Sequence, residues 1–219
     1  NAISDKNRRK RIAAETMEIY APLSERMGMN YIRDELEDLS FQELNPEARN
    51  LIVERLSLNK KDREKTFKEI SKTFEKVLTE KKVNTKIMGR EKTPFSIWRK
   101  MQSRRISLEQ LTDIIGFRVI VDNIKTCYEV LGIFHSMWSM IPGRFKDYIS
   151  TPKINNYKSL HTAVIGPNKE RIEIQIRTQQ MHEFAERGIA SHWKYKSSEK
   201  LSHLALKEYD WLRDLVEII

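Results

Sequence analysis

The sequence predicts a helical module followed by a domain of α/β or α+β class. Apolar residues recur at helical spacing through the first third of the chain, and this residue pattern changes near Val83. From there to about residue 195, segments rich in β-branched residues alternate with amphipathic segments, as expected for strands interleaved with helices in one domain. We expect three parts: a helical module over 1–82, the strand-containing domain over 83–197 and a C-terminal helix over 198–219.

Three helices are expected in the helical module. The first covers residues 8–27 and contains Pro22, so that a kink or a division is expected inside it. The second covers 31–44. The third covers 46–82 and is expected to break near Asn59.

In the second part, β-branched runs bounded by turn residues predict strands. The expected strands cover residues 83–88, 115–122, 159–167 and 170–178, and the last two are paired through a turn at Gly166-Pro167-Asn168. The expected helices cover residues 94–102, 107–113, 125–140, 179–195 and 200–219.

Charge and composition restrict the class of protein. The chain carries 40 Lys and Arg against 31 Asp and Glu, and its net charge of +9 favours anionic partners, either nucleic acid or phosphorylated small molecules. No apolar run approaches the roughly 18–20 residues of a membrane span, and the basic N-terminus lacks the apolar core of a secretory signal. The single cysteine, Cys127, excludes an internal disulfide framework and a multi-cysteine zinc site. We expect a cytoplasmic protein without a membrane partner.

The segment RIEIQIRT at 171–178 alternates as a strand with one apolar and one polar face. Its three isoleucines share one face, which must pack inward. Glu173, Gln175 and Arg177 share the other face and stand about 7 Å apart per step. At a half-exposed sheet edge such a polar row is ordinary, so that alone it favours a solvated strand over a site.

Asp113 lies just before the expected strand at 115–122. A carboxylate there can cap a turn. Paired with Glu173 from another strand, it can instead hold one Mg²⁺, which keeps several waters and takes one or two carboxylates together with substrate phosphates. The spacing to Arg118 puts Asp113 on the opposite face of a regular strand, unless Gly116 introduces a bulge.

A one-sided cluster of cations occupies residues 86–105, where seven basic residues accompany one acid, Glu91. Arg90 and Lys92 lie at a strand end or on a loop, and Lys100 lies on one flank of the expected helix. A guanidinium such as that of Arg90 can stack on a base and bind phosphate bidentately. Basic residues beside aromatic ones occur on many surfaces, and no glycine-rich phosphate loop strengthens the cluster.

The stretch GRFKDYISTPKINNYKSLHT at 143–162 gathers cations around two tyrosines. Tyr157 can stack on a purine and Asn155 can hydrogen-bond it. Lys146 and Lys153 can contact phosphates. His161 lies four residues beyond Tyr157 and is expected to face the same ligand. A molecule with phosphates and a flat base would explain this composition.

Four segments then carry a family resemblance: GREKTPFSIWRKM, TDIIGFRVIVD, GRFKDYISTPKINNYKSLHT and EIQIRTQQMHEFAERGIASHWKYK. In this order they closely resemble the synthetase domain of the RelA/SpoT family of bacterial alarmone enzymes. The resemblance implies transfer of the β,γ-pyrophosphate of ATP to the ribose 3′-hydroxyl of GDP or GTP, which gives AMP and (p)ppGpp. It also implies an α+β fold with a mixed β-sheet flanked by helices, similar to the polymerase-β-type nucleotidyltransferases.

The resemblance assigns the metal and the ATP side by motif. Asp113 and Glu173 match the acids of a magnesium site, and Glu173 is also implied to take the proton of the attacking hydroxyl. Arg90 and Lys100 match residues that hold the base and the phosphates of ATP, with Lys92 assisting. This suits pyrophosphoryl transfer, which depends on alignment and charge neutralisation more than on covalent chemistry.

The acceptor side is implied in the same way. Tyr157 matches the tyrosine that stacks on guanine. The other residues implied to line the GDP or GTP site are Lys146, Lys153, Asn155 and His161. Gln175 and Arg177 are implied to support the shared strand face.

Arg144-Phe145-Lys146-Asp147 resembles the RxKD form of the bifunctional synthetase–hydrolase members, and Arg144 joins the supporting residues. Those members carry a hydrolase with a metal-binding His-Asp pair, whereas none of the five histidines here is followed by Asp. The segment NRRKRIAAETMEIYAPLSERMGM resembles the last helices of that hydrolase without its catalytic part. We therefore expect no hydrolase activity, in a piece of a bifunctional enzyme or a truncated relative.

Two other hypotheses remain at this point. A catalytically silent remnant would bind nucleotides without turning them over. An RNA-binding module would explain the net charge of +9 and the interleaved tyrosines and lysines, but the sequence contains no recognisable RNA-binding motif. We rank the RNA-binding hypothesis third and expect no specific nucleic-acid partner.

Overall fold

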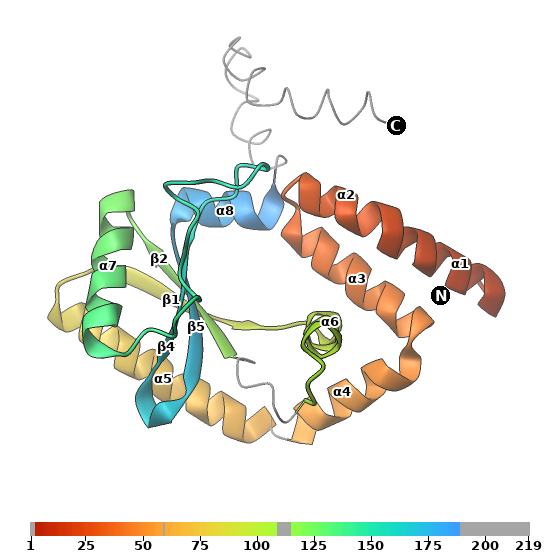
Figure 1. Ribbon diagram of the computed structural model, residues 1–219, viewed down its shortest axis with the longest axis horizontal. Coiled ribbons are helices and arrows are strands. Elements are labelled where there is room, and N and C mark those ends of the chain that lie inside the picture. The colour runs from red at the N-terminus through yellow and green to blue at the C-terminus, as the bar shows by residue number, and fades with distance from the viewer. Residues whose placement is uncertain (1–2, 59, 109–114, 189–219) are drawn as a thin grey trace, which may run out of the picture.

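The computed structural model describes residues 3–58, 60–108 and 115–188 (Figure 1). The elements in chain order are α1 (Lys6–Glu15), the π-helix η1 (Thr16–Tyr20), α2 (Ala21–Arg26), α3 (Asn30–Leu44), α4 (Pro46–Leu58), α5 (Lys60–Glu80), β1 (Thr85–Glu91), α6 (Pro94–Arg104), β2 (Ile115–Val121), α7 (Ile124–Met137), β3 (Lys146–Asp147), β4 (Leu160–Ile165), the 3₁₀-helix η2 (Pro167–Lys169), β5 (Arg171–Thr178) and α8 (Gln179–Arg187). Asp113, most of the helix expected at 107–113 and the helix expected at 200–219 lie outside the described residues.

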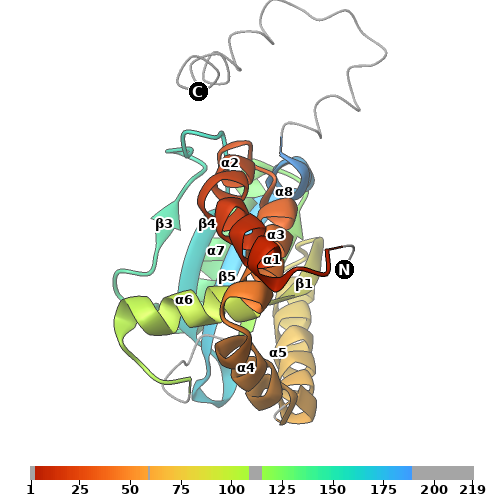
Figure 2. The same ribbon diagram turned by 90° about the vertical axis from the view of Figure 1, so that its right-hand side faces the viewer.

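A five-stranded mixed sheet in the order β1-β2-β5-β4-β3 forms the centre of one half of the molecule. β2 and β5 are parallel, and the other neighbouring strands are antiparallel. α5 and α7 cover one face of the sheet (Figure 1), and α1, α3 and α6 lie in front of β4 and β5 when the right-hand side of Figure 1 faces the viewer (Figure 2). The prediction of a mixed sheet flanked by helices and preceded by a helical region is confirmed.

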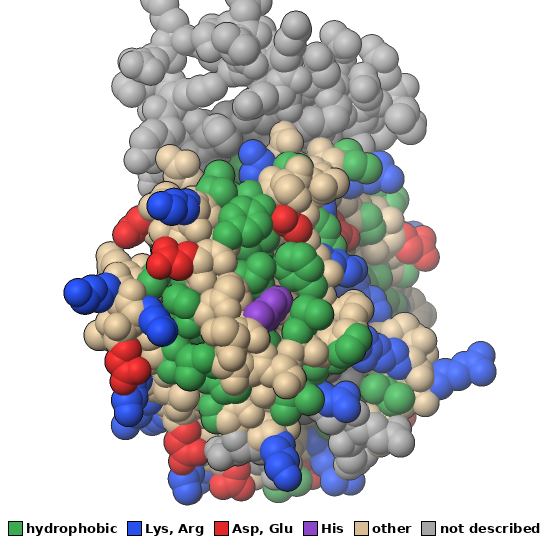
Figure 3. Space-filling view, turned by 60° about the vertical axis from the view of Figure 1, so that its left-hand side comes forward, with side chains coloured by type: hydrophobic (Ala, Val, Ile, Leu, Met, Phe, Trp, Pro, Cys, Tyr) green, Lys and Arg blue, Asp and Glu red, His purple; other side chains and the backbone are tan. Residues whose placement is uncertain are grey.

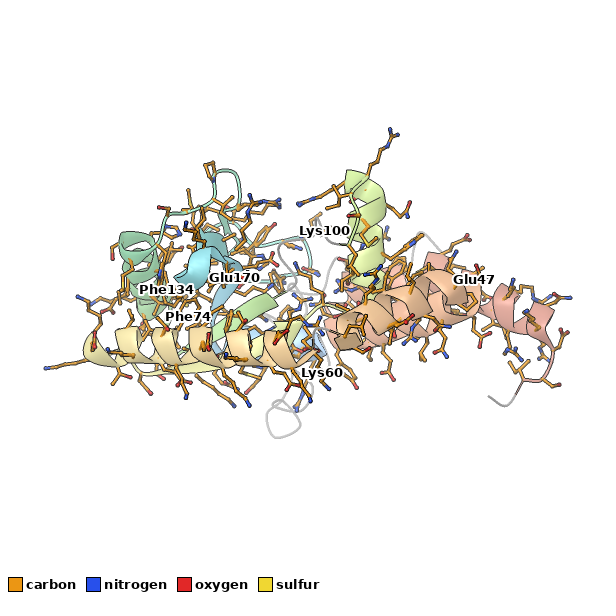
Figure 4. The ribbon with its side chains drawn as sticks, turned by 90° about the horizontal axis from the view of Figure 1, so that it is seen from below. Glu47, Lys60, Phe74, Lys100, Phe134 and Glu170 are labelled. Carbon is orange, nitrogen blue, oxygen red and sulfur yellow. The ribbon has the colours of Figure 1, made fainter. Side chains whose placement is uncertain are left out.

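The main core lies between the sheet and the pair α5 and α7. Phe74 on α5 and Phe134 on α7 point toward each other with ring centroids 4.7 Å apart (Figure 4). Phe117 of β2 stacks on Phe67 at 4.7 Å and meets Phe74 edge-on at 5.2 Å. α5 therefore packs on the sheet, although the predicted boundary near residue 83 places it with the helical module. That boundary stays a prediction.

The helical module packs on α6 through a second, smaller core. Phe41 of α3 contacts Phe95 of α6 edge-on at 5.5 Å, and Ile52 of α4 and Ile97 belong to the same cluster. Glu37 is buried in this contact and accepts a hydrogen bond from Arg99 at 3.0 Å. This second core fixes α3 beside the sheet-bearing half.

The irregularity expected near Pro22 is present as a π-helical turn. The N–H of Ala21 donates to the carbonyl of Thr16, five residues back. Proline lacks an N–H group, and its ring clashes with the carbonyl four residues before it in a regular helix. The wider π turn relieves that clash without ending the helix, which reaches its turn at Gly28.

Side-chain caps start the helices that border the sheet. Thr93 accepts from the N–H of Ser96 at the start of α6, where Pro94 takes the first helical position. Asn123 caps α7 in the same way at 2.9 Å, and Thr178 caps α8. The caps place α6 directly after β1 and α8 directly after β5, so that both helices begin where a strand of the sheet ends.

The outer surface on the α7 side carries hydrophobic side chains with a histidine among them (Figure 3). Exposed hydrophobic residues of α7 and the following segment include Tyr128, Met137, Met140 and Phe145. Within the described ranges, no helix combines the length and the apolar character that crossing a membrane requires.

Candidate active site

The strand register brings polar side chains from four strands to one face of the sheet. Residues directly opposite each other in neighbouring strands point to the same face. Arg118 pairs with Gln175, which also pairs with His161 on its other side, so these three side chains form a row across β2, β5 and β4. We call this side the polar face and define it by the residues Arg90, Arg118, His161, Glu173, Gln175 and Arg177. The opposite side, covered by α5 and α7, is called the apolar face.

β5 is a central strand, so the expectation of a half-exposed sheet edge is wrong. Both neighbours of β5 are paired along its length. The predicted alternation itself is confirmed, because Ile174 is fully buried on the apolar face. The polar face is covered as well: Gln175 is 6% exposed and Arg177 is 1% exposed. Buried polar groups need partners, and their placement here defines an interior site and not a solvated surface.

A small cavity of about 110 Å³ lies on the polar face. Seven of its lining residues were predicted from the sequence: Arg90, Lys153, Asn155, Tyr157, His161, Gln175 and Arg177. The lining residues that sequence reasoning missed include Glu25, Asn30, Arg33, Arg118 and Glu186. The alternation of IGFRVIVD indicates that Arg118 faces away from the core, but only the strand order places it beside Gln175.

Three aromatic rings meet at the cavity. The Tyr157 hydroxyl lies 2.8 Å from Nε2 of His161, which confirms that these two residues face the same space. Tyr148 approaches the His161 ring edge-on at 5.2 Å. The Lys153 ammonium lies 5.2 Å from the centroids of both tyrosine rings. The cluster is the cation-and-aromatic arrangement that the stretch 143–162 indicated.

His161 is neutral at physiological pH. Burial lowers its pKa to about 4, and the positive charge of Arg177 adds to that shift. Glu173 opposes the shift through its negative charge. A neutral imidazole has one nitrogen that donates and one that accepts a hydrogen bond.

One carboxylate, Glu186 of α8, faces several basic groups at the floor of the cavity. Its Oε1 lies 3.0 Å from Arg118, 3.9 Å from His182 and 4.0 Å from Arg177. Burial lowers the pKa of both arginines, yet guanidinium groups stay charged in proteins. The floor therefore keeps an excess of positive charge, which favours an anionic ligand.

Glu173 lies at the outer end of the polar face and forms an ion pair with Lys92 at 3.0 Å. Its side chain is 36% exposed, so that one hard oxygen ligand is accessible to a divalent cation. Asp113, the other expected ligand, lies outside the described residues, and the meeting of the two acids stays a prediction. In the described ranges no group of three or more His, Cys, Asp or Glu side chains converges as a metal site would.

Three predicted cations lie away from the cavity wall. Lys146 is opposite His161 in the β3–β4 register and is exposed. Arg144 is exposed in the segment before β3. Lys100 is partly buried on α6 and is labelled in Figure 4. Their assigned roles stay predictions.

The helical module forms the rim of the cavity. The side-chain amide of Asn155 donates to the backbone carbonyl of Glu25 at 2.9 Å, and that of Asn30 donates to the carbonyl of Ala185 at 2.7 Å. A Cβ atom on Gly188 would lie 2.3 Å from the carbonyl oxygen of Met27, so the backbones touch here. Tertiary contacts between the turn after α2 and the end of α8 thus narrow the entrance.

Residues 89–200 match the model of a family described as the region found in RelA / SpoT proteins. The chain belongs to the RelA/SpoT family. A protein of Brucella melitensis named GTP pyrophosphokinase rsh is 49% identical over 220 residues, which cover 96% of this chain and 29% of that protein. A protein of Aquifex aeolicus named guanosine-3′,5′-bis(diphosphate) 3′-pyrophosphohydrolase is 47% identical, over 97% of this chain and 30% of its own length.

This chain thus spans less than a third of the length of these RelA/SpoT relatives. Among solved structures, the small alarmone synthetase 2 of Bacillus subtilis aligns with 73% of this chain and 93% of its own chain, at 23% identity and a TM-score of 0.49. The family match includes α8 and the strands β2, β4 and β5, which carry most of the polar face.

Proposed function

We propose that this RelA/SpoT chain carries a (p)ppGpp synthetase site, which transfers the β,γ-pyrophosphate of ATP to the 3′-hydroxyl of GDP or GTP. The observation that carries the proposal is the polar face, where cations, a tyrosine–histidine pair and one accessible carboxylate share a single side of the sheet. The cytoplasmic location expected from the sequence belongs to the same proposal, since its substrates are ATP and guanine nucleotides.

The acceptor nucleotide is assigned to the tyrosine side of the cavity. Stacking of a nucleobase on an aromatic ring is worth about 1–3 kcal/mol. Lys153 now lies 5.2 Å from the ring centroid of Tyr157. When guanine stacks on this ring, the flexible lysine can turn its ammonium toward the phosphates and keep its charge neutralised.

The donor nucleotide is assigned to the β1–β2 side. Arg90 lines the cavity there and lies 3.8 Å from Asp34 of the helical module. Arg118 lies beside it on the polar face. Two guanidinium groups on one side of the sheet can bind phosphates bidentately and neutralise their charge. Lys92 and Lys100 are assigned to the polyphosphate as well.

Glu173 is the proposed base. The 3′-hydroxyl oxygen of the acceptor attacks the β-phosphorus of ATP, its proton passes to the Glu173 carboxylate, and the bond to the bridging oxygen breaks so that AMP leaves. This carboxylate is accessible and suits a Mg²⁺ site with Asp113, and Mg²⁺ when bound supplies positive charge that stabilises the polyphosphate. Lys92, paired with Glu173 at 3.0 Å, fixes the position of that carboxylate.

The cavity must enlarge before it accepts a nucleotide. Ligand pockets for molecules of this size measure about 300–1,000 Å³, whereas the present cavity measures about 110 Å³. Asn155, assigned to the base, is bonded to Glu25 of the helical rim. We therefore assign nucleotide binding to a state in which the turn after α2 has moved away from the polar face.

The test is incubation of the chain with radiolabelled ATP, GTP and Mg²⁺. AMP and pppGpp are expected in equal amounts, and a folded chain that forms neither product would reject the proposal. Calorimetry distinguishes a silent remnant, which would bind the nucleotides without turnover. With ppGpp as the substrate we expect no release of pyrophosphate, since none of the five histidines is followed by Asp.

A further inference from the structure

Arg177 is the largest fully buried side chain among the described residues. The proposed reaction gives no role to its charge. It is 1% exposed on the polar face, and its Nε and Nη1 atoms have no hydrogen-bond partner among the described residues. Its ion pair with Glu186 is long, at 4.0 Å, and Glu186 also pairs with Arg118 at 3.0 Å. Burying a charge without close pairing is costly, so packing alone does not account for an arginine here.

The contacts that Arg177 does make lead to the Tyr157 hydroxyl. Its guanidinium lies 5.6 Å from the Tyr157 ring centroid, and Nη2 donates to the hydroxyl oxygen over 3.5 Å. Nη2 also donates to Oε1 of Gln175. Gln175 thereby holds the guanidinium at the hydroxyl, from the neighbouring position on the polar face of β5.

These contacts decide where the hydroxyl proton points. A guanidinium can only donate, so the Tyr157 oxygen accepts from Arg177 and its own proton must point elsewhere. The other partner of that oxygen is Nε2 of His161, at 2.8 Å. Among the contacts of the described residues, Nε2 is the acceptor within reach of the hydroxyl proton, so the arrangement that uses this proton has Tyr157 donating to Nε2 and the neutral ring of His161 carrying its proton on Nδ1.

We propose that Arg177 is a positioning residue that sets the hydrogen-bond polarity of the Tyr157–His161 pair, so that the imidazole presents an Nδ1–H donor at the acceptor site. The use of this N–H group by the acceptor nucleotide rests on the proposed function. The direction of the Tyr157–His161 hydrogen bond does not, because it can be measured in the chain without nucleotides. Arg177 acts through Tyr157 and needs no contact with substrate.

The charged and titratable groups around His161 agree with this arrangement. Arg177 and Glu173 face it from β5, Arg90 from β1, and Lys153 and Tyr157 from the segment before β4. Burial and the nearby cations lower the pKa of His161 to about 4. Removal of Arg177 is therefore expected to raise the pKa of His161 and to allow the Nε2–H tautomer beside the Nδ1–H tautomer.

The test is the tautomer of His161 in long-range ¹H–¹⁵N correlation spectra of the labelled chain, assigned by comparison with His161→Gln. The wild type is expected to show the Nδ1–H tautomer throughout the neutral range. Arg177→Met is expected to show both tautomers and a higher His161 pKa. Arg49→Met is the matched control, because Arg49 has a buried, unpartnered Nε and an ion pair with Asp38 at 2.6 Å, remote from the cavity.

Tyr157→Phe covers the case in which Arg177→Met does not fold. It removes only the hydroxyl and leaves both the ring and Arg177 in place, and it should release the tautomer just as the arginine variant does. A purely structural role of Arg177 predicts an unchanged tautomer in Arg177→Met, whereas Tyr157→Phe tests whether the hydroxyl sets the tautomer. An Nε2–H tautomer in the wild type, or an Nδ1–H tautomer kept in both variants, overturns the inference.

Kinetics give a second readout. Arg177→Met is expected to raise KM for GDP by about tenfold to a hundredfold and to leave KM for ATP nearly unchanged, whereas Arg49→Met alters neither. Equal changes of both KM values would contradict a role at the acceptor site. If the wild type makes no pppGpp yet shows the expected tautomer, the proposed function fails and the inference stands.

Discussion

The two faces of the sheet use the same strands for opposite purposes. On the apolar face, Ile174 and Phe117 are buried against α5 and α7, and the buried cluster of the described residues is made of hydrophobic and aromatic side chains. On the polar face, the buried side chains include Gln175 and Arg177, with the accessible carboxylate of Glu173 one step away. Both faces contain fully buried side chains, although Glu173 on the polar face stays 36% exposed, so burial by itself does not distinguish the core from a site.

The difference lies in what the buried groups require. Apolar side chains are satisfied by any close packing, at about 25 cal/mol per Å² of area removed from water. Buried ions require specific partners, and Arg177 has two nitrogens without one among the described residues. The apolar face therefore supplies stability, and we assign the charged ligand of the proposed reaction to the polar face. Substitutions on the two faces should separate into losses of stability and losses of activity.

Glu173→Gln on the polar face should produce the largest effect. The proposed base is lost while the shape of the side chain is kept, so we expect kcat to fall by roughly a thousandfold with little change in the free energy of unfolding. Steady-state synthesis of pppGpp and thermal unfolding measure the two quantities. Glu170→Gln, an exposed neighbour labelled in Figure 4, is the control and should keep full activity. If the two variants had comparable activity, Glu173 would not be the base of the reaction.

Phe117→Ala on the apolar face should mainly destabilise the fold. The ring stacks on Phe67 and contacts Phe74, and its removal leaves a cavity that costs about 3–5 kcal/mol. Urea unfolding measures this loss. Ile165→Ala, at a side chain 44% exposed on β4, should lose much less. If Phe117→Ala were as stable as the wild type, the division of roles between the faces would be wrong.

Tyr157→Ala sharpens the assignment within the polar face. Loss of the stacking platform, worth about 1–3 kcal/mol, should raise KM for GDP by roughly tenfold to a hundredfold and leave KM for ATP close to its wild-type value. The control is Tyr128→Ala, at an exposed tyrosine of α7 that donates to Asp147. A larger increase in KM for ATP than in KM for GDP would show that Tyr157 belongs to the ATP site.

The pH dependence of stability tests the burial of His161. Its pKa falls from 6.5 in the unfolded chain to about 4 in the folded chain, because burial and Arg177 disfavour the charged form. Between these values the unfolded state binds more protons, so stability should decrease as the pH falls from about 6.5 toward 4. Urea midpoints at pH 7 and pH 5 should differ more for the wild type than for His161→Gln, which retains the contributions of His135 and His182. Equal differences would contradict a buried neutral His161.

Asn30→Ala should have the smallest effect and concerns the rim. It removes the hydrogen bond to the carbonyl of Ala185 at 2.7 Å, which is worth about 0.5–1.5 kcal/mol. The rim should open more often, so that the apparent affinity for GDP increases by a few fold. Isothermal titration with GDP measures this change, with the exposed Asn50→Ala as control. Weaker GDP binding in Asn30→Ala would show that the rim helps to hold the nucleotide.

Local pattern predicted the elements of the sheet well. The alternation of RIEIQIRT fixed which residues of β5 face the core, and the four-residue spacing of Tyr157 and His161 placed them on one ligand-facing side, as their hydrogen bond shows. The helix beginning at Pro94 follows from proline at the first helical position and the threonine cap before it. Each of these features depends on residues close together in the chain.

Long-range features escaped the sequence. Strand order is set by crossovers and not by local spacing, so β5 was expected at a half-exposed edge and is central. The approach of Glu25, Asn30 and Arg33 to the cavity depends on how the helical module packs on α6 and α8. Gly28 has a positive φ in the turn after α2, but its backbone contact with Gly188 follows only from the tertiary structure.

The most direct test of the account is a titration of the isotope-labelled chain with GDP, followed by NMR. The account predicts that the ring signals of Tyr157 and His161 shift and reach a plateau as GDP is added. The δ1-methyl signals of Ile172, Ile174 and Ile176, on the apolar face of β5, should change little. Saturating shifts at the isoleucine methyls with unchanged Tyr157 and His161 rings would contradict it.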